Sequence, residues 1–271
     1  MLGDNAQPAD IAGMRRELGL DRPLWRQYLE YLGGLARGDL GESLSMRQPV
    51  GRLISERYPA TLELAAAGLV LAIVIAFPLG LIAGFNPGGA ADAGAMSLAI
   101  LGISIPHLYL GPLLMIIFSL RLRWLPLTGR GGVSHLILPA LTLGTALAAI
   151  IARMLRQSLV QVLAADYIRT ARSKGLSRNA ALIRHGLRNA LTPVITLLGL
   201  EAGALLTGSI ITEVIFSWPG LGRLMINAIG NRDYPLVEGC VLTFALSYVV
   251  VNAISDVVYS VVDPRIRLQR R

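Results

Sequence analysis

The sequence contains few charged residues and a single cysteine, and each shortage excludes a class of protein. Only 15% of the 271 residues are charged, 54% are hydrophobic and the mean hydropathy is +0.58, which is too apolar for a soluble domain of this length. Cys240 stands alone, so an intramolecular disulfide or a cysteine-based metal cage is excluded. Because the three histidines are also widely separated, we expect no metal site and no cofactor.

Lysine is almost absent as well, which argues against ATP binding by this chain. The only lysine, Lys174, precedes Gly175 instead of following a glycine-rich turn, so the sequence has no phosphate-binding loop of the Walker A type. No set of nucleophile, base and orienting residue is recognisable either. We therefore expect that the chain is not an enzyme.

Long apolar runs occupy the stretches that lack charge. A bilayer core of roughly 30 Å requires about 20 apolar residues in a spanning helix. The runs are continuous rather than alternating, which favours helices over β-strands. The predicted fold is therefore an all-α, polytopic membrane helical bundle. Its five predicted transmembrane helices are residues 61–84, 95–120, 135–155, 191–213 and 237–261.

The net charge of +8 is concentrated in two segments next to apolar spans. Residues 152–190 hold eight basic side chains against one acidic, and residues 263–271 hold four against one, whereas residues 1–60 balance eight of each. Aromatic residues that stack on bases are nearly absent from both basic segments, so no nucleic-acid partner is expected. Basic loops beside spans are typically cytoplasmic. We therefore predict a multi-pass protein of the cytoplasmic (inner) membrane with its C-terminus in the cytoplasm.

The N-terminal 60 residues pose a topological problem. Five spans place the chain ends on opposite faces of the membrane, so residues 1–60 are predicted to form an external amphipathic segment, followed by a transmembrane domain of residues 61–271. Residues 1–30 contain no apolar stretch of the signal-peptide type that would carry this segment across. We therefore expect a further transmembrane helix upstream of Met1.

The basic segment at about residues 157–191 is predicted to contain two amphipathic helices. Lys174, Gly175 and Leu176 have the pattern of a helix C-terminus: a cation, a glycine able to adopt the left-handed conformation, and an apolar residue. The apolar face of the first helix recurs at every fourth position, at Leu155, Leu159, Leu163 and Tyr167.

The second helix is expected to begin at the cap residue Ser177 and to end near Ala190, with Thr192 and Pro193 starting the next span. Two interpretations of the pair are open. It is either a basic amphipathic element lying on the anionic inner leaflet, or an element that docks in a cleft of a cytoplasmic partner and passes its motion to the spans.

A family resemblance favours docking. Residues 166–176 (DYIRTARSKGL) and 184–193 (RHGLRNALTP) resemble the ATPase-docking (EAA) loop of ABC importer permeases, in the variant of dipeptide, oligopeptide and nickel systems. The general pattern of that loop has glutamate where Arg169 stands and alanine where Thr170 stands. The resemblance implies a docking role for Asp166, Tyr167, Arg169, Thr170, Ala171, Arg172, Lys174, Gly175, Leu176, Arg184 and His185.

Other stretches resemble the same family, including residues 15–24 with 27–28, and residues 38–43, 213–222 and 263–267. The resemblance implies a permease subunit that translocates small peptides, or related solutes such as nickel chelates or glutathione. It implies four kinds of partner: cytoplasmic ATPase subunits, a second homologous permease, an external substrate-binding protein and the lipid bilayer. Relatives usually begin with a transmembrane helix. The alternative is an ion-gradient-driven secondary transporter, although no convincing internal repeat is present.

Two places are candidates for the transport pathway or gate. Glu201 lies near the middle of the fourth span, and an ionisable residue there either faces a pathway or bonds a neighbouring helix. Trp218, Pro219 and Gly220 suit an interfacial aromatic anchor on a tight turn of the outer loop. This turn either borders the external gate or is only a re-entrant connector.

Overall fold

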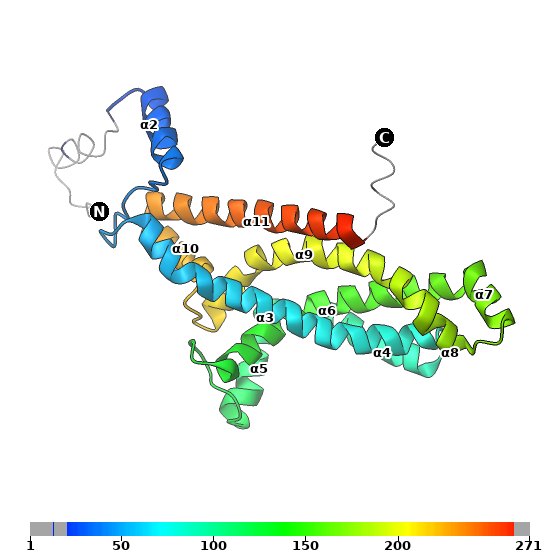
Figure 1. Ribbon diagram of the computed structural model, residues 1–271. Coiled ribbons are helices and arrows are strands. Elements are labelled where there is room, and N and C mark those ends of the chain that lie inside the picture. The colour runs from blue at the N-terminus through cyan, green and yellow to red at the C-terminus, as the bar shows by residue number, and fades with distance from the viewer. Residues whose placement is uncertain (1–12, 14–20, 263–271) are drawn as a thin grey trace, which may run out of the picture. The chain divides into compact units, whose positions relative to one another are not determined.

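The computed structural model describes Gly13 and residues 21–262, and these residues form helices joined by loops, with one isolated bridge between Glu42 and Pro49. The predicted all-α fold is confirmed. Figure 1 shows the elements, which are α2 (Leu24–Ala36), α3 (Val50–Phe85), α4 (Ala90–Ser104), α5 (His107–Leu114), the π-helix η1 (Met115–Arg121), α6 (Val133–Leu163), α7 (Asp166–Ser173), α8 (Arg178–Ala181), the π-helix η2 (Leu182–Gly186), α9 (Leu187–Ile215), α10 (Leu221–Gly230) and α11 (Tyr234–Val262).

Some predictions fall on parts of the chain that the structure does not describe. Residues 1–12, 14–20 and the basic C-terminal residues 263–271 lie outside the described residues, so the external position of the first and the cytoplasmic position of the last stay predictions. The predicted domain boundary between residues 60 and 61 lies inside α3 and also stays a prediction.

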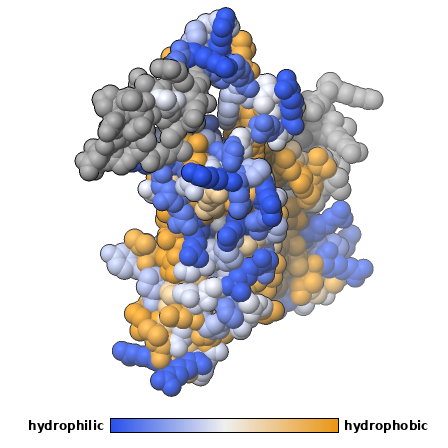
Figure 2. All heavy atoms as spheres, turned by 90° about the vertical axis from the view of Figure 1, so that its left-hand side faces the viewer, coloured by the Kyte–Doolittle hydropathy of each residue, from blue (hydrophilic) through white to orange (hydrophobic). Residues whose placement is uncertain are grey.

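Within the described residues, four helical segments are long and apolar enough to cross a membrane: α3, α6, the continuous run Arg178–Ile215, and α11. A fifth span is present if the bent pair formed by α4 and α5 with η1 is counted as one. The five predicted spans thus correspond to these elements. Large apolar side chains such as Val70, Val74, Leu246 and Val257 remain more than half exposed, which suits a surface in contact with lipid. Figure 2 shows orange hydrophobic side chains beside blue hydrophilic ones on one face of the protein.

The second predicted span differs in shape from the expectation of one continuous helix over residues 95–120. Its two halves, Ala90–Ser104 and His107–Arg121, meet at an angle of 101°. Ile105 is extended (φ −94°, ψ 112°) because the ring of Pro106 disfavours helical geometry in the preceding residue, and proline has no amide to continue the ladder. His107 begins the second half, and its Nδ1 lies 2.7 Å from the carbonyl oxygen of Thr142 in α6.

The chain forms two compact units. The first comprises the described residues up to Tyr58 together with Leu224–Thr243, and the second comprises Pro59–Arg223 together with the described residues from Phe244. In the second unit α6 is central, since it packs against α4, α5 and α9. The core of this unit includes Leu64, Leu143, Leu147, Ile151 and Leu155.

Glycines bring α3 and α6 close together within the second unit. A Cβ atom on Gly144 would lie 2.6 Å from the carbonyl oxygen of Gly68, so the two backbones are in contact. Further along, Gly80 and Gly84 of α3 leave room for Leu155 and Leu159 of α6. Helices in lipid lack a strong hydrophobic drive to associate, so close approach at small residues is what holds them together.

We expect Gly144→Ala to lower the thermal stability of the protein in detergent. The new methyl group would force α3 and α6 apart, and overpacking of this kind costs about 1–3 kcal/mol. The control is Gly94→Ala in α4, where a Cβ atom would meet nothing within 4 Å and alanine is the better helix former. Equal unfolding midpoints for the two variants would contradict the assigned contact.

The first unit is fastened by the fully buried side chain of Asp233. Its carboxylate accepts hydrogen bonds from the hydroxyls of Ser43 and Ser45, both at 2.6 Å, and from the amides of Leu44 at 3.1 Å and Ser45 at 3.0 Å. The amide of Leu236 in the first turn of α11 also donates to it, at 3.4 Å. Burial raises the pKa of Asp233, but the hydrogen bonds from the two serines and from the backbone outweigh it, and the net pKa is lowered.

A carboxylate whose pKa is lower in the folded state stabilises that state above its unfolded pKa of about 4 and ceases to do so as the pH falls through the lowered value. We therefore expect Asp233→Asn to be less stable than the parent protein near pH 6, and the difference between them to shrink below about pH 4. Thermal unfolding of both proteins between pH 6 and 3 measures this. Parallel curves over the whole range would show that Asp233 does not act through its charge.

Candidate functional site

Helix α7 (Asp166–Ser173) ends in a glycine C-cap. Gly175 has φ +93°, a left-handed conformation that favours glycine. Its amide donates to the carbonyl of Arg172 at 3.0 Å, and the amide of Leu176 donates to the carbonyl of Ala171 at 3.3 Å. These are the two bonds of a Schellman motif, and Leu176 packs back on the helix it terminates. The helix C-terminus predicted around Gly175 is confirmed.

A second helix starts directly after this turn. The hydroxyl of Ser177 accepts a hydrogen bond from the amide of Ala180 at 3.3 Å, so the predicted N-cap is confirmed. The sequence predicts that this second helix ends near Ala190, but α8 continues through the π-helix η2 into α9. Residues Arg178–Ile215 therefore form one helical segment of 38 residues.

The expected start of the fourth span at Thr192 and Pro193 is wrong. Both residues lie inside α9, which begins at Leu187. A proline removes one backbone donor and usually kinks a helix, but it does not have to end it. The irregular part of this helical segment is instead the π-helix η2, directly before α9.

The predicted apolar stripe Leu155, Leu159, Leu163 and Tyr167 is also interrupted. Helix α6 ends at Leu163 and α7 begins at Asp166, with Ala165 extended between them. The break turns α7 so that Ile168 and Ala171 are buried with Ala181, whereas Tyr167 is 42% exposed. The Tyr167 hydroxyl accepts a hydrogen bond from Asn189 Nδ2 at 3.1 Å, which links α7 to α9.

The predicted docking residues gather on one connected helical element between α6 and α9. Ala171 is buried and Leu176 half-buried, and both hold the element together. The others lie on its outside: Asp166, Tyr167, Arg169, Thr170, Arg172, Lys174, Gly175, Arg184 and His185 are all exposed.

The exposed side of this element is positively charged. Asp166 is the one acidic residue of the sequence between residues 152 and 190, and it lies 3.5 Å from the guanidinium of Arg169. Both side chains are at least 80% exposed, so the pair adds little stability. The remaining basic side chains leave a surface suited to an acidic partner surface or to anionic lipid.

Glu201 is half-buried in α9, and its neighbouring glycines have a packing role. A Cβ atom on Gly199 would lie 2.7 Å from the Cβ of Ser255, and one on Gly203 would lie 3.0 Å from the ring of Tyr248, so α9 and α11 touch along this face. Two positions along a helix turn a side chain by roughly 200°, which directs Glu201 away from that contact. Its role in a pathway stays a prediction.

The structure places Trp218, Pro219 and Gly220 in the loop between α9 and α10. Trp218 is fully buried, and its Nε1 donates to the carbonyl oxygen of Ala60 in α3 at 2.8 Å. The expectation of an interfacial anchor is therefore wrong for Trp218, because its ring and its one polar atom are satisfied inside the protein. The gate role of the loop stays a prediction.

Besides Asp233, two buried acidic residues are not among the predicted site residues. Glu213, at the end of α9, is fully buried. Asp92, at the start of α4, accepts hydrogen bonds from Arg156 of α6 at 2.7 and 3.1 Å and from the amide of Gly88 at 2.8 Å. No local pattern in the sequence indicates the contacts of Asp92 with Arg156 or of Glu213 with Thr61, because these partners lie 64 and 152 residues away.

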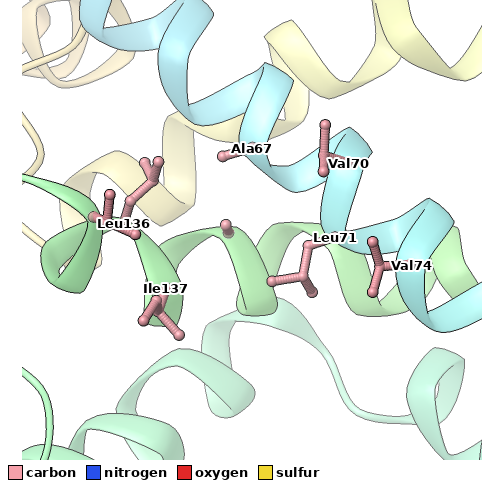
Figure 3. Close-up of a pocket in the computed structure, with 8 residues that line it drawn as sticks. Ala67, Val70, Leu71, Val74, Leu136 and Ile137 are labelled. Carbon is pink, nitrogen blue, oxygen red and sulfur yellow. The ribbon is translucent and has the colours of Figure 1, made fainter.

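An apolar groove between α3 and α6 is unsuited to a polar solute. Its volume is about 260 Å³. The lining side chains, shown in Figure 3, are all aliphatic, and no polar group converges on the groove to orient a ligand. They are Ala67, Val70, Leu71, Val74, Val133, Leu136, Ile137 and Ala140. This groove is therefore not a candidate substrate site.

The spans, together with an exposed basic element between two of them, define an integral membrane protein. Residues 76–268 match the family model described as binding-protein-dependent transport system inner membrane component, and residues 1–65 match the model of its N-terminal region. The chain belongs to this family. It is therefore a multi-pass inner-membrane permease component of an ABC importer, it is not an enzyme, and it works with an ATPase and a binding protein. The alternative of an ion-gradient-driven transporter is set aside.

Characterised relatives agree with this assignment. The glutathione transport system permease protein GsiC of Escherichia coli (strain K12) is 43% identical over 265 residues, which cover 98% of this chain and 87% of the relative. GsiC of Salmonella typhi is 44% identical over the same coverage.

Solved structures show the same fold at low sequence identity. An inward-facing structure of the MetNI methionine ABC transporter matches with a TM-score of 0.64 at 17% identity, over 78% of this chain and 96% of the other. An amino acid ABC transporter crystallised with histidines matches with a TM-score of 0.60 at 18% identity, over 79% and 94%.

Proposed function

We propose that α7, α8 and η2 seat in a cleft of the cytoplasmic ATPase and drive α9. The observation that carries this proposal is the continuity of Arg178–Ile215, because a force on α8 reaches the middle of the membrane without crossing a flexible joint. Exposed basic side chains on one side of the element supply the contact, and the buried Ile168, Ala171 and Ala181 keep the element rigid.

The orientation follows from the same element. The segment 157–191 is the most basic loop of the chain, and basic loops stay on the cytoplasmic side. Since two spans separate this segment from residues 263–271, the C-terminus is cytoplasmic as well. The loops at 121–134 and 216–220 then face outward, toward the binding protein.

The permease is half of a channel. In the proposed complex it pairs with a second, homologous permease, and two ATPase subunits bind the two docking elements. Closure of the ATPases on binding ATP shifts α7 and α8, which biases the spans toward an outward-facing state that accepts solute from the binding protein.

The cargo we propose is a small peptide or a peptide-like solute such as glutathione. The support is the 43% identity to glutathione permeases across 98% of this chain. The aliphatic groove between α3 and α6 offers nothing to such a solute, so the route lies elsewhere, and Glu201 is the candidate residue along it.

Docking is tested by a matched pair of substitutions at Gly175. Nothing lies within 4 Å of a Cβ atom there, and asparagine and aspartate tolerate the left-handed conformation at a similar cost. In the complete complex we expect Gly175→Asp to reduce binding-protein-stimulated ATP hydrolysis at least about tenfold, because it places a negative charge on a basic docking surface. Gly175→Asn, of the same shape without the charge, should retain most of it. Normal stimulated hydrolysis in both variants, with normal membrane insertion, would refute docking.

The cargo is tested on the binding protein that works with this permease. Native mass spectrometry of that protein after purification, followed by calorimetry with glutathione and with di- and tripeptides, should show a bound peptide-like solute. Retention of a sugar, or of a single free amino acid in preference to peptides, would contradict the proposed cargo class.

A further inference from the structure

Glu213 makes contacts that take no part in the proposed docking or in binding of the solute. It lies in the last turn of α9, and its side chain is fully buried. Oε1 accepts a hydrogen bond from the hydroxyl of Thr61 in α3 at 2.7 Å and lies 3.2 Å from the hydroxyl of Ser209. Oε2 accepts from the backbone amide of Arg223 at 3.0 Å. One carboxylate thus bonds to α3 and to the start of α10 from its position on α9.

The first turn of α10 is capped by these side chains rather than by a residue of its own. The amide of Leu221 donates to the Thr61 hydroxyl at 2.8 Å, and that hydroxyl donates its proton to Glu213. The first amides of a helix have no partner within it and carry partial positive charge, so a carboxylate is a favourable acceptor. The amide of Leu221 is therefore linked to Glu213 through the Thr61 hydroxyl, whereas the amide of Arg223 donates to Glu213 directly.

The glycines of the loop make room for this carboxylate. A Cβ atom on Gly220 would overlap the Glu213 carboxyl group. One on Gly222 would lie 2.7 Å from the backbone Cα of Ile210 and 3.0 Å from Glu213 Oε2. Any side chain at either position would displace the loop from α9, so the sequence from Trp218 to Gly222 is matched to the buried acid below it.

Three further bonds hold the same loop. Trp218 Nε1 donates to the Ala60 carbonyl at 2.8 Å, next to Thr61. The Arg223 guanidinium donates to the carbonyl of Ser217 at 2.7 Å, and the amide of Gly129 donates to the carbonyl of Phe216 at 2.9 Å. Each residue from Phe216 to Trp218 is thereby tied to another part of the second unit.

We infer that Glu213 and Thr61 form a clamp that joins α3 and the end of α9 to the first turn of α10, so that the outer loop moves as part of these helices during transport. The loop from Phe216 to Gly220 is then not a flap that opens by itself. Alternating access at this end requires α3 and α9 to move together with the loop. Glu213 acts as a positioning residue and does not touch the solute, because Gly220 covers the carboxylate and its oxygens already have donors.

The variants that test the clamp differ by single atoms or groups. Thr61→Val keeps the shape and removes the hydroxyl, whereas Thr61→Ser keeps the hydroxyl. Glu213→Gln replaces one acceptor oxygen by an NH₂ donor, which would face either the amide of Arg223 or the relay hydroxyl of Thr61. A double variant, Thr61→Val with Glu213→Gln, measures whether the two side chains act as one device.

Two readouts separate the clamp from the proposed docking function. Hydrogen–deuterium exchange of the assembled complex reports the amides of residues 221–223 and needs no solute. Loss of a hydrogen bond to a buried charged group should speed their exchange about ten- to hundredfold, while residues 166–188 of the docking element stay unchanged. Solute uptake into proteoliposomes should fall by a similar factor, with ATP hydrolysis retained.

The expected pattern is specific. Thr61→Val and Glu213→Gln both show fast exchange and poor uptake, the double variant is no worse than the poorer single variant, and Thr61→Ser behaves as the parent. Unchanged exchange at residues 221–223, additive losses in the double variant, or failure of Thr61→Ser to rescue would each overturn the clamp. Loss of complex assembly in Glu213→Gln would also overturn it, since Glu213 would then serve only folding.

Discussion

Backbone amides at helix starts and in the adjoining loops have few partners inside an apolar protein, and in the described part of this chain three buried carboxylates accept hydrogen bonds from such amides. Glu213 receives an amide of the first turn of α10, Asp233 receives an amide of α11 and two from residues 44–45, and Asp92 receives the amide of Gly88. Each carboxylate also binds a side chain from a distant segment. These three acidic residues therefore join segments that are distant in the sequence, and each lies close to the beginning or the end of a helix.

Along the spans, close contact between helices depends on glycine. The contact of Gly68 with Gly144 brings α3 against α6, and Gly199 and Gly203 bring α9 against α11. Large aliphatic side chains point outward instead, where lipid receives them without cost. This division explains why the groove between α3 and α6 is wholly apolar, and why the polar contacts that define movable parts lie at the ends of the spans.

Transmission of force follows from how the helices are joined. The Schellman turn at Gly175 is the one sharp bend between α7 and α8, and beyond it the chain stays helical to Ile215. At the far end of the same segment, Glu213 binds Thr61 and the backbone amide of Arg223 in the first turn of α10. In the proposed docking function, a displacement of α7 and α8 passes along α9 to a group of segments that are hydrogen-bonded together, which is the arrangement that rigid-body alternating access needs.

Much of this protein is determined by local sequence. Apolar length defines the spans, excess arginine marks the loop at 157–191, and the cap residues Gly175 and Ser177 define where α7 ends and α8 begins, because each of these effects acts within a few residues. The backbone shape at prolines is not determined locally: the bend at Pro106 and the continuous helix through Pro193 depend on whether neighbouring helices support the backbone around a proline. Only the tertiary structure decided the buried position of Trp218, the contact of Glu213 with Thr61 and the contact of Asp92 with Arg156, because these partners lie 64 or more residues apart and no periodicity in the sequence indicates them.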